Sequence, residues 1–122
     1  MTDTELAAVL RACEGPSFDE RRDAALVRVF LSTGARLSEV ANLRWTPEVP
    51  ETNDVDLDAG VMRVMGKGRR ERIAFLSPKA VKALDRYLRL RARHRFAALP
   101  WLWLVMALAG WRSREMLSRY AK

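Results

Sequence analysis

The sequence predicts an α+β fold that is mostly helical, with a small three-stranded antiparallel sheet packed against the helices. Apolar residues recur every three or four positions between residues 3 and 45, which is typical of amphipathic helices. From Val55 the spacing changes to strand-like alternation, and after Ser77 it returns to a helical period. With 122 residues, 49% of them hydrophobic, the chain is large enough to form one domain with its own core.

The first helix is expected to begin at Thr2 or Asp3 and to end before Gly15 and Pro16. Cys13 falls on the apolar face of this helix, so we expect a small core residue and not a nucleophile. A single cysteine also excludes an internal disulfide, and a reducing cytoplasm is the simplest setting for the chain.

The second helix is expected to start at Ser17, because Ser17 and Glu20 have the spacing of a capping box, and to stop at Gly34. A third helix follows at once, with Ser38 as its expected cap and an apolar stripe formed by Leu37, Val40 and Leu43. Arg36 lies in the turn between the two helices. Its guanidinium is therefore expected near a helix N-terminus, where anions are favoured.

Residues 46–54 contain two prolines and predict a loop. Strands are expected at residues 55–57, 61–65 and 71–76, separated by turns at 58–60 and 66–68. The tip of the hairpin around the second turn carries four cations, Lys67, Arg69, Arg70 and Arg72, next to two glycines that let the backbone bend. After this hairpin, Ser77 and Pro78 predict the start of a helix that runs to about Arg91.

The chain is basic, with a formal charge of +7 and a pI near 10.5, which favours a nucleic-acid partner. Nearly all of the excess is arginine, so a compositional bias of the source genome is an alternative explanation. No signal sequence or membrane-spanning run is found, so a cytoplasmic protein is expected. One basic cluster is expected to be a solvated helix face, with contact to DNA phosphates as the alternative; it contains Arg86, Arg89, Arg91, Arg93, His94 and Arg95. His94 has no second histidine for a metal site.

The segment from Thr33 to Trp45 resembles the first arginine box of the tyrosine recombinases, the phage integrase family of DNA breaking and rejoining enzymes. The resemblance implies that Arg36 binds the scissile phosphate. The residues alone leave a second interpretation open, in which Arg36 is an ordinary solvated arginine.

Two further segments resemble the same family. Lys67 matches the hairpin lysine that protonates the leaving 5′ hydroxyl, and it follows Arg36 by 31 residues. Trp111 matches the His/Trp position, and Tyr120, nine residues later, matches the nucleophile. From the residues alone, the hairpin tip could equally be a solvated turn and Tyr120 could face a core. Further candidate contacts to DNA phosphates are Arg44, Arg69, Arg70 and Arg112.

The sequence departs from the family between Arg95 and Leu108, because it contains no His-x-x-Arg box to supply a second phosphate-binding arginine. We therefore interpret residues 1–122 as a partial tyrosine-recombinase catalytic domain, truncated and internally deleted. Residues 1–95 form its first half with the arginine and lysine boxes, and residues 105–122 form the terminal Trp/Tyr segment. Loss of the intervening helices is expected to expose Trp101, Trp103 and Leu104.

The function implied by the resemblance is site-specific breakage and rejoining of double-stranded DNA through a 3′-phosphotyrosyl intermediate, without metal or nucleotide cofactor. Losing one of two phosphate-binding arginines is expected to cost about 10³-fold or more in rate, so catalysis should be impaired. Two alternatives remain: a non-catalytic basic DNA-binding module, and an inert remnant of an integrase. A full-length recombinase, or a second copy of the chain, is a further candidate partner.

Overall fold

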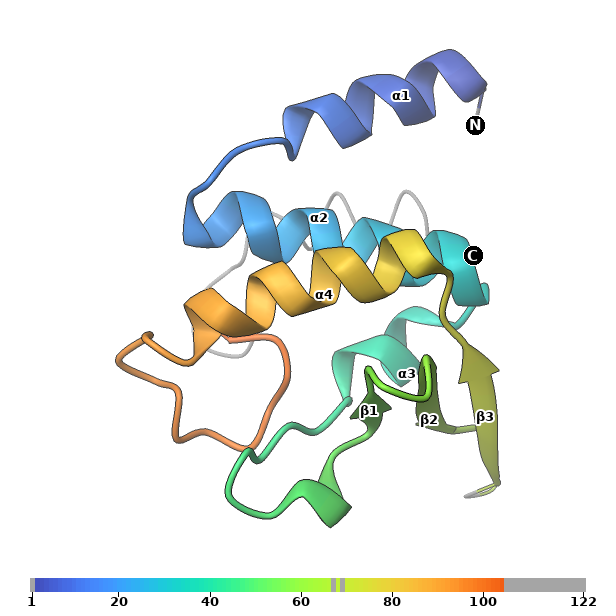
Figure 1. Cartoon of the computed structure of the whole chain (residues 1–122). Helices are drawn as coiled ribbons and strands as arrows, with labels where there is room; N and C mark the ends of the chain where they lie inside the picture. Colours follow the sequence, from blue (N-terminus) through green and yellow to red (C-terminus); the bar gives the residue numbers. More distant parts are fainter. Residues whose placement is uncertain (1, 67, 69, 105–122) are drawn as a thin grey trace.

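The computed structural model describes residues 2–66, 68 and 70–104 (Figure 1). Its helices are α1 (Asp3–Ala12), α2 (Phe18–Thr33), α3 (Leu37–Ala41) and α4 (Pro78–Arg91), and a 3-10 turn lies at Pro50–Thr52. Its strands are β1 (Val55–Asp56), β2 (Val61–Met65) and β3 (Glu71–Phe75). The predicted α+β class is confirmed. No helix in this part of the chain is both long and apolar enough to cross a bilayer.

Most helix ends lie where the capping residues predict them. The hydroxyls of Thr2, Ser17 and Ser77 each accept a hydrogen bond from the backbone N–H three residues later, at 3.0, 3.1 and 3.2 Å. Gly34 ends α2 with a left-handed φ of 63°. The prediction of Ser38 as the cap of α3 is wrong, because the N-cap residue is Arg36, two residues earlier, and the helix begins at Leu37.

The sheet has the order β1-β2-β3, with both pairs antiparallel. Strand alternation buries Met62, Val64 and Ala74 on one face and leaves Ile73 and Phe75 exposed on the other. The first strand is two residues long, shorter than predicted. The sheet therefore has one face in the core and one face in solvent.

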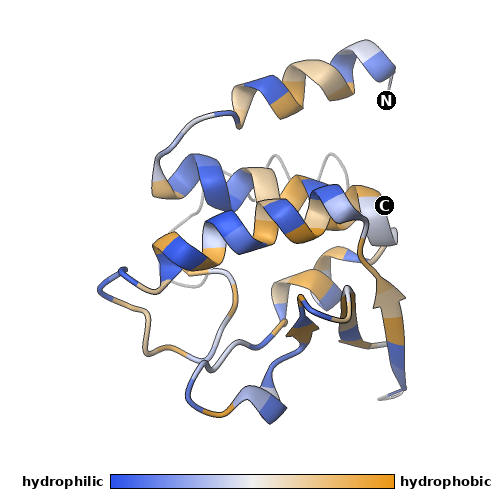
Figure 2. Ribbon diagram, in the orientation of Figure 1, coloured by the Kyte–Doolittle hydropathy of each residue, from blue (hydrophilic) through white to orange (hydrophobic). Residues whose placement is uncertain are grey.

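Helices α2 and α4 lie side by side and form the central layer of the molecule (Figure 1). Helix α1 lies on one side of this layer, and α3 and the sheet lie on the other. Hydrophilic and hydrophobic residues alternate along α2 and α4, as expected for helices with one buried face (Figure 2). The Ser32 hydroxyl joins the layer to the sheet, since it donates to the Phe75 carbonyl at 3.2 Å and accepts from Ser77 N at 2.6 Å.

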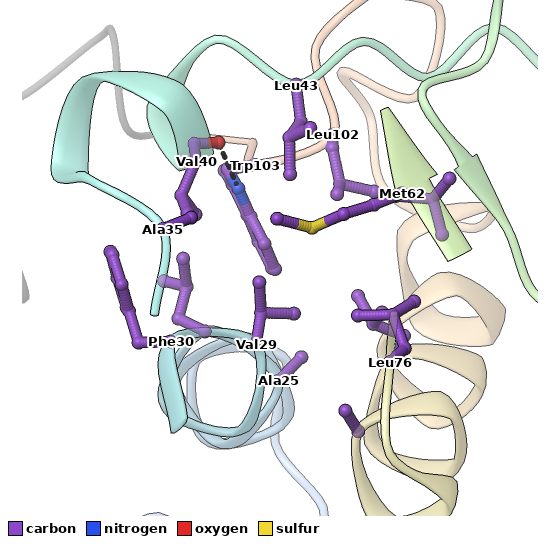
Figure 3. Close-up of a cluster of buried hydrophobic side chains, with 14 of the residues drawn as sticks. Ala25, Val29, Phe30, Ala35, Val40, Leu43, Met62, Leu76, Leu102 and Trp103 are labelled. Atoms are coloured by element: carbon purple, nitrogen blue, oxygen red, sulfur yellow. Dashed lines mark hydrogen bonds between the residues drawn. The ribbon is translucent and has the colours of Figure 1, made fainter. Parts of the chain in front are cut away.

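The core lies between the α2–α4 layer, α3 and the sheet, and Trp103 is at its centre (Figure 3). The Trp103 indole donates to the Val40 carbonyl at 2.9 Å and stacks on Tyr87 with ring centroids 5.4 Å apart. Trp103 is 2% exposed and Leu104 is 1% exposed, whereas Trp101 is 37% exposed. The expectation that all three would be exposed is therefore wrong for Trp103 and Leu104, because the segment after α4 folds back into the core.

Arg91 corrects another expectation, since it was counted among solvated cations and is 1% exposed. Its guanidinium donates to five backbone carbonyls, those of Trp45, Ala97, Leu99, Trp101 and Leu102, at 2.6 to 3.5 Å. Arg91 thus anchors the loop that follows α4. Desolvation by burial lowers its pKa.

Candidate functional site

Arg36 lies at the corner between α2 and α3, on the side of the central layer that also holds the sheet (Figure 1). Gly34 turns the chain with a positive φ, and Arg36 follows in extended conformation with φ −78° and ψ 154°. The side chain is exposed and forms no ion pair with any described residue. Arg36 therefore presents an uncompensated positive charge to solvent.

Glu39 holds the backbone of this corner through hydrogen bonds. The carboxylate is buried, and its Oε1 accepts the backbone N–H of Arg36 at 2.8 Å and the Arg72 guanidinium at 3.0 Å. A Cβ at Gly66 would lie 3.6 Å from Glu39 Oε2. One carboxylate thus joins the N-terminus of α3 to β3 of the β2–β3 hairpin and lies near Gly66 at the end of β2.

The structure describes the β2–β3 hairpin up to Gly66 on one arm and from Arg70 on the other, with Gly68 between them. Gly66 N donates to the Arg70 carbonyl at 2.7 Å, and Gly68 has a positive φ of 75° that favours glycine. Arg70 is exposed. Lys67 and Arg69 lie outside the described residues, but both belong by sequence to the stretch between Gly66 and Arg70.

Arg44 follows α3 and is held by its surroundings. Its backbone N–H donates to Asp54 Oδ2 at 2.7 Å, and its guanidinium lies 5.5 Å from the centre of the Trp101 ring. Arg44 is exposed, so its charge is positioned and still available to an anion.

A hollow of about 590 Å³ lies between α3 and the sheet, beside Arg44. Its charged lining consists of three carboxylates and two arginines: Glu39, Asp54, Glu71, Arg44 and Arg63. Arg63 is paired with Asp54 at 3.3 Å and with Glu71 at 3.2 Å. The excess of carboxylates disfavours an anion inside this hollow. The exposed cations around it are therefore the better candidates for contacts to phosphates.

The structure brings Arg36, Arg44 and the base of the hairpin to one side of the molecule. Trp111, Arg112 and Tyr120 lie outside the described residues, so their placement stays a prediction. The described chain holds no group of three histidine, cysteine or carboxylate side chains suited to a metal ion.

His94 and Cys13, for which the sequence predicts no chemical role, pack against other side chains in the structure. His94 follows α4 and packs on Phe18 with ring centroids 4.5 Å apart, and burial lowers its pKa, with Arg95 and Arg91 adding to the effect. Burial also raises the pKa of Cys13 to about 11, so this thiol stays protonated at neutral pH and is a poor nucleophile.

Sequence reasoning placed Glu39 in the first turn of α3 and counted Arg72 among the cations of the hairpin tip, but it missed the ion pair between the two. Strand alternation was the available signal, because Arg72 shares the inward face of β3 with buried Ala74. A cation on the inward face needs a carboxylate partner, and Glu39 supplies it.

Comparison with known proteins gives a consistent family. The model of the Phage integrase family matches residues 1–98. Tyrosine recombinase XerC of Thermodesulfovibrio yellowstonii is 40% identical over 81 residues, which are 64% of this chain and 25% of that protein. Tyrosine recombinase XerC of Xanthomonas axonopodis pv. citri is 43% identical over 68 residues, which are 56% of this chain and 20% of that protein. The chain thus spans a quarter or less of the length of these relatives.

A solved structure is similar as well. The crystal structure of XerA recombinase matches with a TM-score of 0.68 and 26% sequence identity, over 95% of this chain and 38% of the XerA chain.

Proposed function

The chain belongs to the phage integrase family of tyrosine recombinases, and from this premise we propose that it binds double-stranded DNA with a backbone phosphate at Arg36. The observation that carries the proposal is that Arg36 is exposed and has no ion pair with a described residue, while Glu39 binds its backbone N–H and pairs with Arg72 of the β2–β3 hairpin. A solvent-facing guanidinium on a fixed backbone suits a phosphate because its planar fork can donate two hydrogen bonds at once.

The hairpin and the end of α3 would supply further phosphate contacts. The candidates are Arg44 after α3, Arg70 at the start of the β3 arm, and Lys67 and Arg69, which lie in the sequence between Gly66 and Arg70. Each cation that neutralises a phosphate releases counterions, so this binding should weaken steeply with salt. The charge of +7 adds a sequence-independent attraction.

The chemistry we propose for these residues follows the family resemblance. The Tyr120 oxygen would attack the phosphorus, Arg36 and Trp111 would stabilise the charge on the phosphoryl oxygens, and the 5′ oxygen would leave with a proton from Lys67. The covalent 3′-phosphotyrosyl link would keep the energy of the broken bond for rejoining. Positioning and charge neutralisation dominate such a reaction, so each arginine matters.

We propose that cleavage is impaired, because the sequence has no His-x-x-Arg box to provide a second arginine. In this proposal residues 1–95 and 105–122 are the two remaining parts of a catalytic domain. His94 does not replace the missing box, since it lacks the spacing to an arginine and packs on Phe18.

DNA binding is tested by titrating the full chain with a fluorescent duplex at several salt concentrations. Arg36→Ala should weaken binding and lower the salt slope by about 1, as expected for one lost phosphate contact. Arg11→Ala is the matched control, because Arg11 is an exposed arginine on α1, on the other side of the central layer. Equal losses in the two variants would show that only net charge matters and would overturn the Arg36 assignment.

Cleavage is tested with a nicked suicide duplex whose sequence around the nick is randomised. A covalent protein–DNA adduct that disappears in Tyr120→Phe would support the enzyme. If Tyr120→Phe binds DNA as the wild type does and neither protein forms an adduct, the chain is a binding module without strand cleavage. The absent His-x-x-Arg box is the observation that favours this second candidate.

A further inference from the structure

A second basic surface lies on the side of the α2–α4 layer away from Arg36. A hollow of about 290 Å³ opens in the angle between α1, α2 and α4. Figure 1 shows α1 on one side of the central layer, with α3 and the sheet on the opposite side. The charged lining of this hollow, called the α1 groove below, consists of Glu14, Arg21, Arg28, Lys79, Lys82 and Arg86.

Cations outnumber carboxylates in the lining of the α1 groove. Five cations face one carboxylate, and none of the five forms an ion pair with another described residue. Elsewhere in the described chain Arg63, Arg72 and Arg89 each have a carboxylate partner. Like charges gathered in a concave surface focus a positive potential, and a matching anion lowers their mutual repulsion.

The cations are arranged in two rows. Arg21 and Arg28 are seven residues apart on α2, and Lys79 and Arg86 are seven residues apart on α4. Seven residues of helix rise about 10.5 Å, and each strand of DNA carries one charge per about 3.4 Å of helix axis. Each row therefore has the length of about three consecutive phosphates of one strand.

The floor of the α1 groove is low and uncharged. Ala24 of α2 and Ala83 of α4 line it between the two rows, so the small side chains leave the hollow open. Helix α1 has no buried residue, and only its C-cap residue Cys13 is packed away from solvent. The wall formed by α1 therefore lines the groove without filling it.

We propose that the α1 groove binds the backbone phosphates of a second DNA duplex, so that one chain holds two duplexes on opposite sides of its α2–α4 layer. The phosphate site in the α1 groove shares no residue with the Arg36 surface, so its contribution to the salt slope is independent of Arg36, whereas the bridging of two duplexes rests on the proposed DNA contact at Arg36. Two rows of separated cations fit a polymeric anion better than a single small phosphate, which would be contacted by one end of the groove only.

The test compares two triple variants that remove the same charge. The groove variant is Arg28→Ala, Lys82→Ala and Arg86→Ala, and the control variant is Arg11→Ala, Arg89→Ala and Arg93→Ala. Alanine favours helices, and thermal melts verify that both variants stay folded. Duplex binding is measured against salt, and bridging is measured as capture of a fluorescent duplex by an immobilised one, at concentrations where the protein sediments as a monomer.

The groove variant should lower the salt slope by about 3 and abolish bridging, whereas the control variant should change both far less. Arg36→Ala tests the other surface. Adding the three groove substitutions to Arg36→Ala should lower the salt slope further, by as much as they lower it in the wild type. Equal effects of the two triple variants on the slope would reduce the groove to bulk charge and overturn the proposal. If inorganic pyrophosphate stabilises the wild type but not the groove variant, and the duplex slope is unchanged, the occupant is a small anion and the proposal also fails.

Discussion

Arg91 and Arg36 place the same side chain in two opposite environments. Arg91 is 1% exposed and donates to five backbone carbonyls, whereas Arg36 is exposed and forms no ion pair with a described residue. The first closes the loop after α4, and the second leaves its hydrogen-bonding capacity to an external anion. The comparison teaches that an arginine available for binding is recognised by what it does not contact, provided that its backbone is fixed.

The largest effect is expected for Arg91→Ala. The substitution leaves several buried or half-buried carbonyls without a donor, and each such loss costs about 1–3 kcal/mol. We expect the free energy of unfolding to fall by about 3 kcal/mol or more, measured by urea denaturation with tryptophan fluorescence. Arg89→Ala is the control, because Arg89 forms only an exposed pair with Asp85 and should change stability by less than about 1 kcal/mol. A loss below that control value would contradict the anchoring role of Arg91.

A smaller effect is expected for Tyr87→Phe, which keeps the ring that stacks on Trp103. The hydroxyl donates to the Leu102 carbonyl at 2.7 Å and accepts from Leu104 N at 3.1 Å, and both partners are buried. Its removal should lower the free energy of unfolding by about 1–3 kcal/mol. An unchanged urea midpoint would show that these two bonds do not hold the returning segment.

Tyr87 also predicts a dependence of stability on alkaline pH. Burial raises the pKa of Tyr87 from 10.0 to about 12. The unfolded chain therefore loses this proton first, so the stability from the neutral phenol is complete below pH 10 and decreases as the pH rises toward 12. Urea midpoints from pH 8 to about 11.5 should fall less steeply for Tyr87→Phe than for the wild type; parallel curves would exclude the contribution.

Glu39→Gln tests how the backbone around Arg36 is held, and we expect an intermediate loss of stability. The amide keeps an acceptor for Arg36 N but loses the charge that pairs with Arg72 at 3.0 Å. Since Glu39 is buried and Arg72 is partly exposed, we expect a loss of about 1–2 kcal/mol in stability. Arg72→Ala should lose a similar amount, and the double variant should lose less than the sum of the two. Full additivity would mean that the pair does not couple the hairpin to α3.

The smallest effect on stability is expected for Arg36→Ala, which makes the same substitution as Arg91→Ala. An exposed side chain without an ion pair should change the free energy of unfolding by no more than about 0.5 kcal/mol. DNA affinity should fall nonetheless. A stability loss as large as that of Arg91→Ala would remove the distinction between the two arginines.

Much of the fold could be predicted from the sequence because its signals are local. Ser17, Gly34 and Ser77 mark helix ends through hydrogen bonds within a few residues, and the structure confirms all three. Ser38 was assigned wrongly as a cap, because Glu39 can satisfy the N-terminus of α3 with its own side chain. Propensity favours Ser38 over Arg36 as a cap, so the start of α3 could not be assigned from residue preference alone.

The misassigned residues depend on contacts between distant parts of the chain. Arg91 lies on the buried stripe of α4 that contains Leu84 and Tyr87. Its helical position therefore indicated burial, but arginine is usually exposed, and it was assigned to the solvated face for that reason. Trp103 is buried because Val40, 63 residues earlier, accepts its indole hydrogen bond. For the candidate site, the sequence singled out Arg36 and the hairpin, but the Glu39–Arg72 link between them depends on tertiary packing.

The Ser32 hydroxyl has a consequence for how force passes through the molecule. It holds the end of β3 and the first turn of α4 to the last turn of α2, only a few residues before Arg36. A displacement of the C-terminal end of β3 is therefore passed to the end of α2 through two hydrogen bonds. We therefore expect Arg36 to follow displacements of β3, because the corner that carries it comes directly after α2.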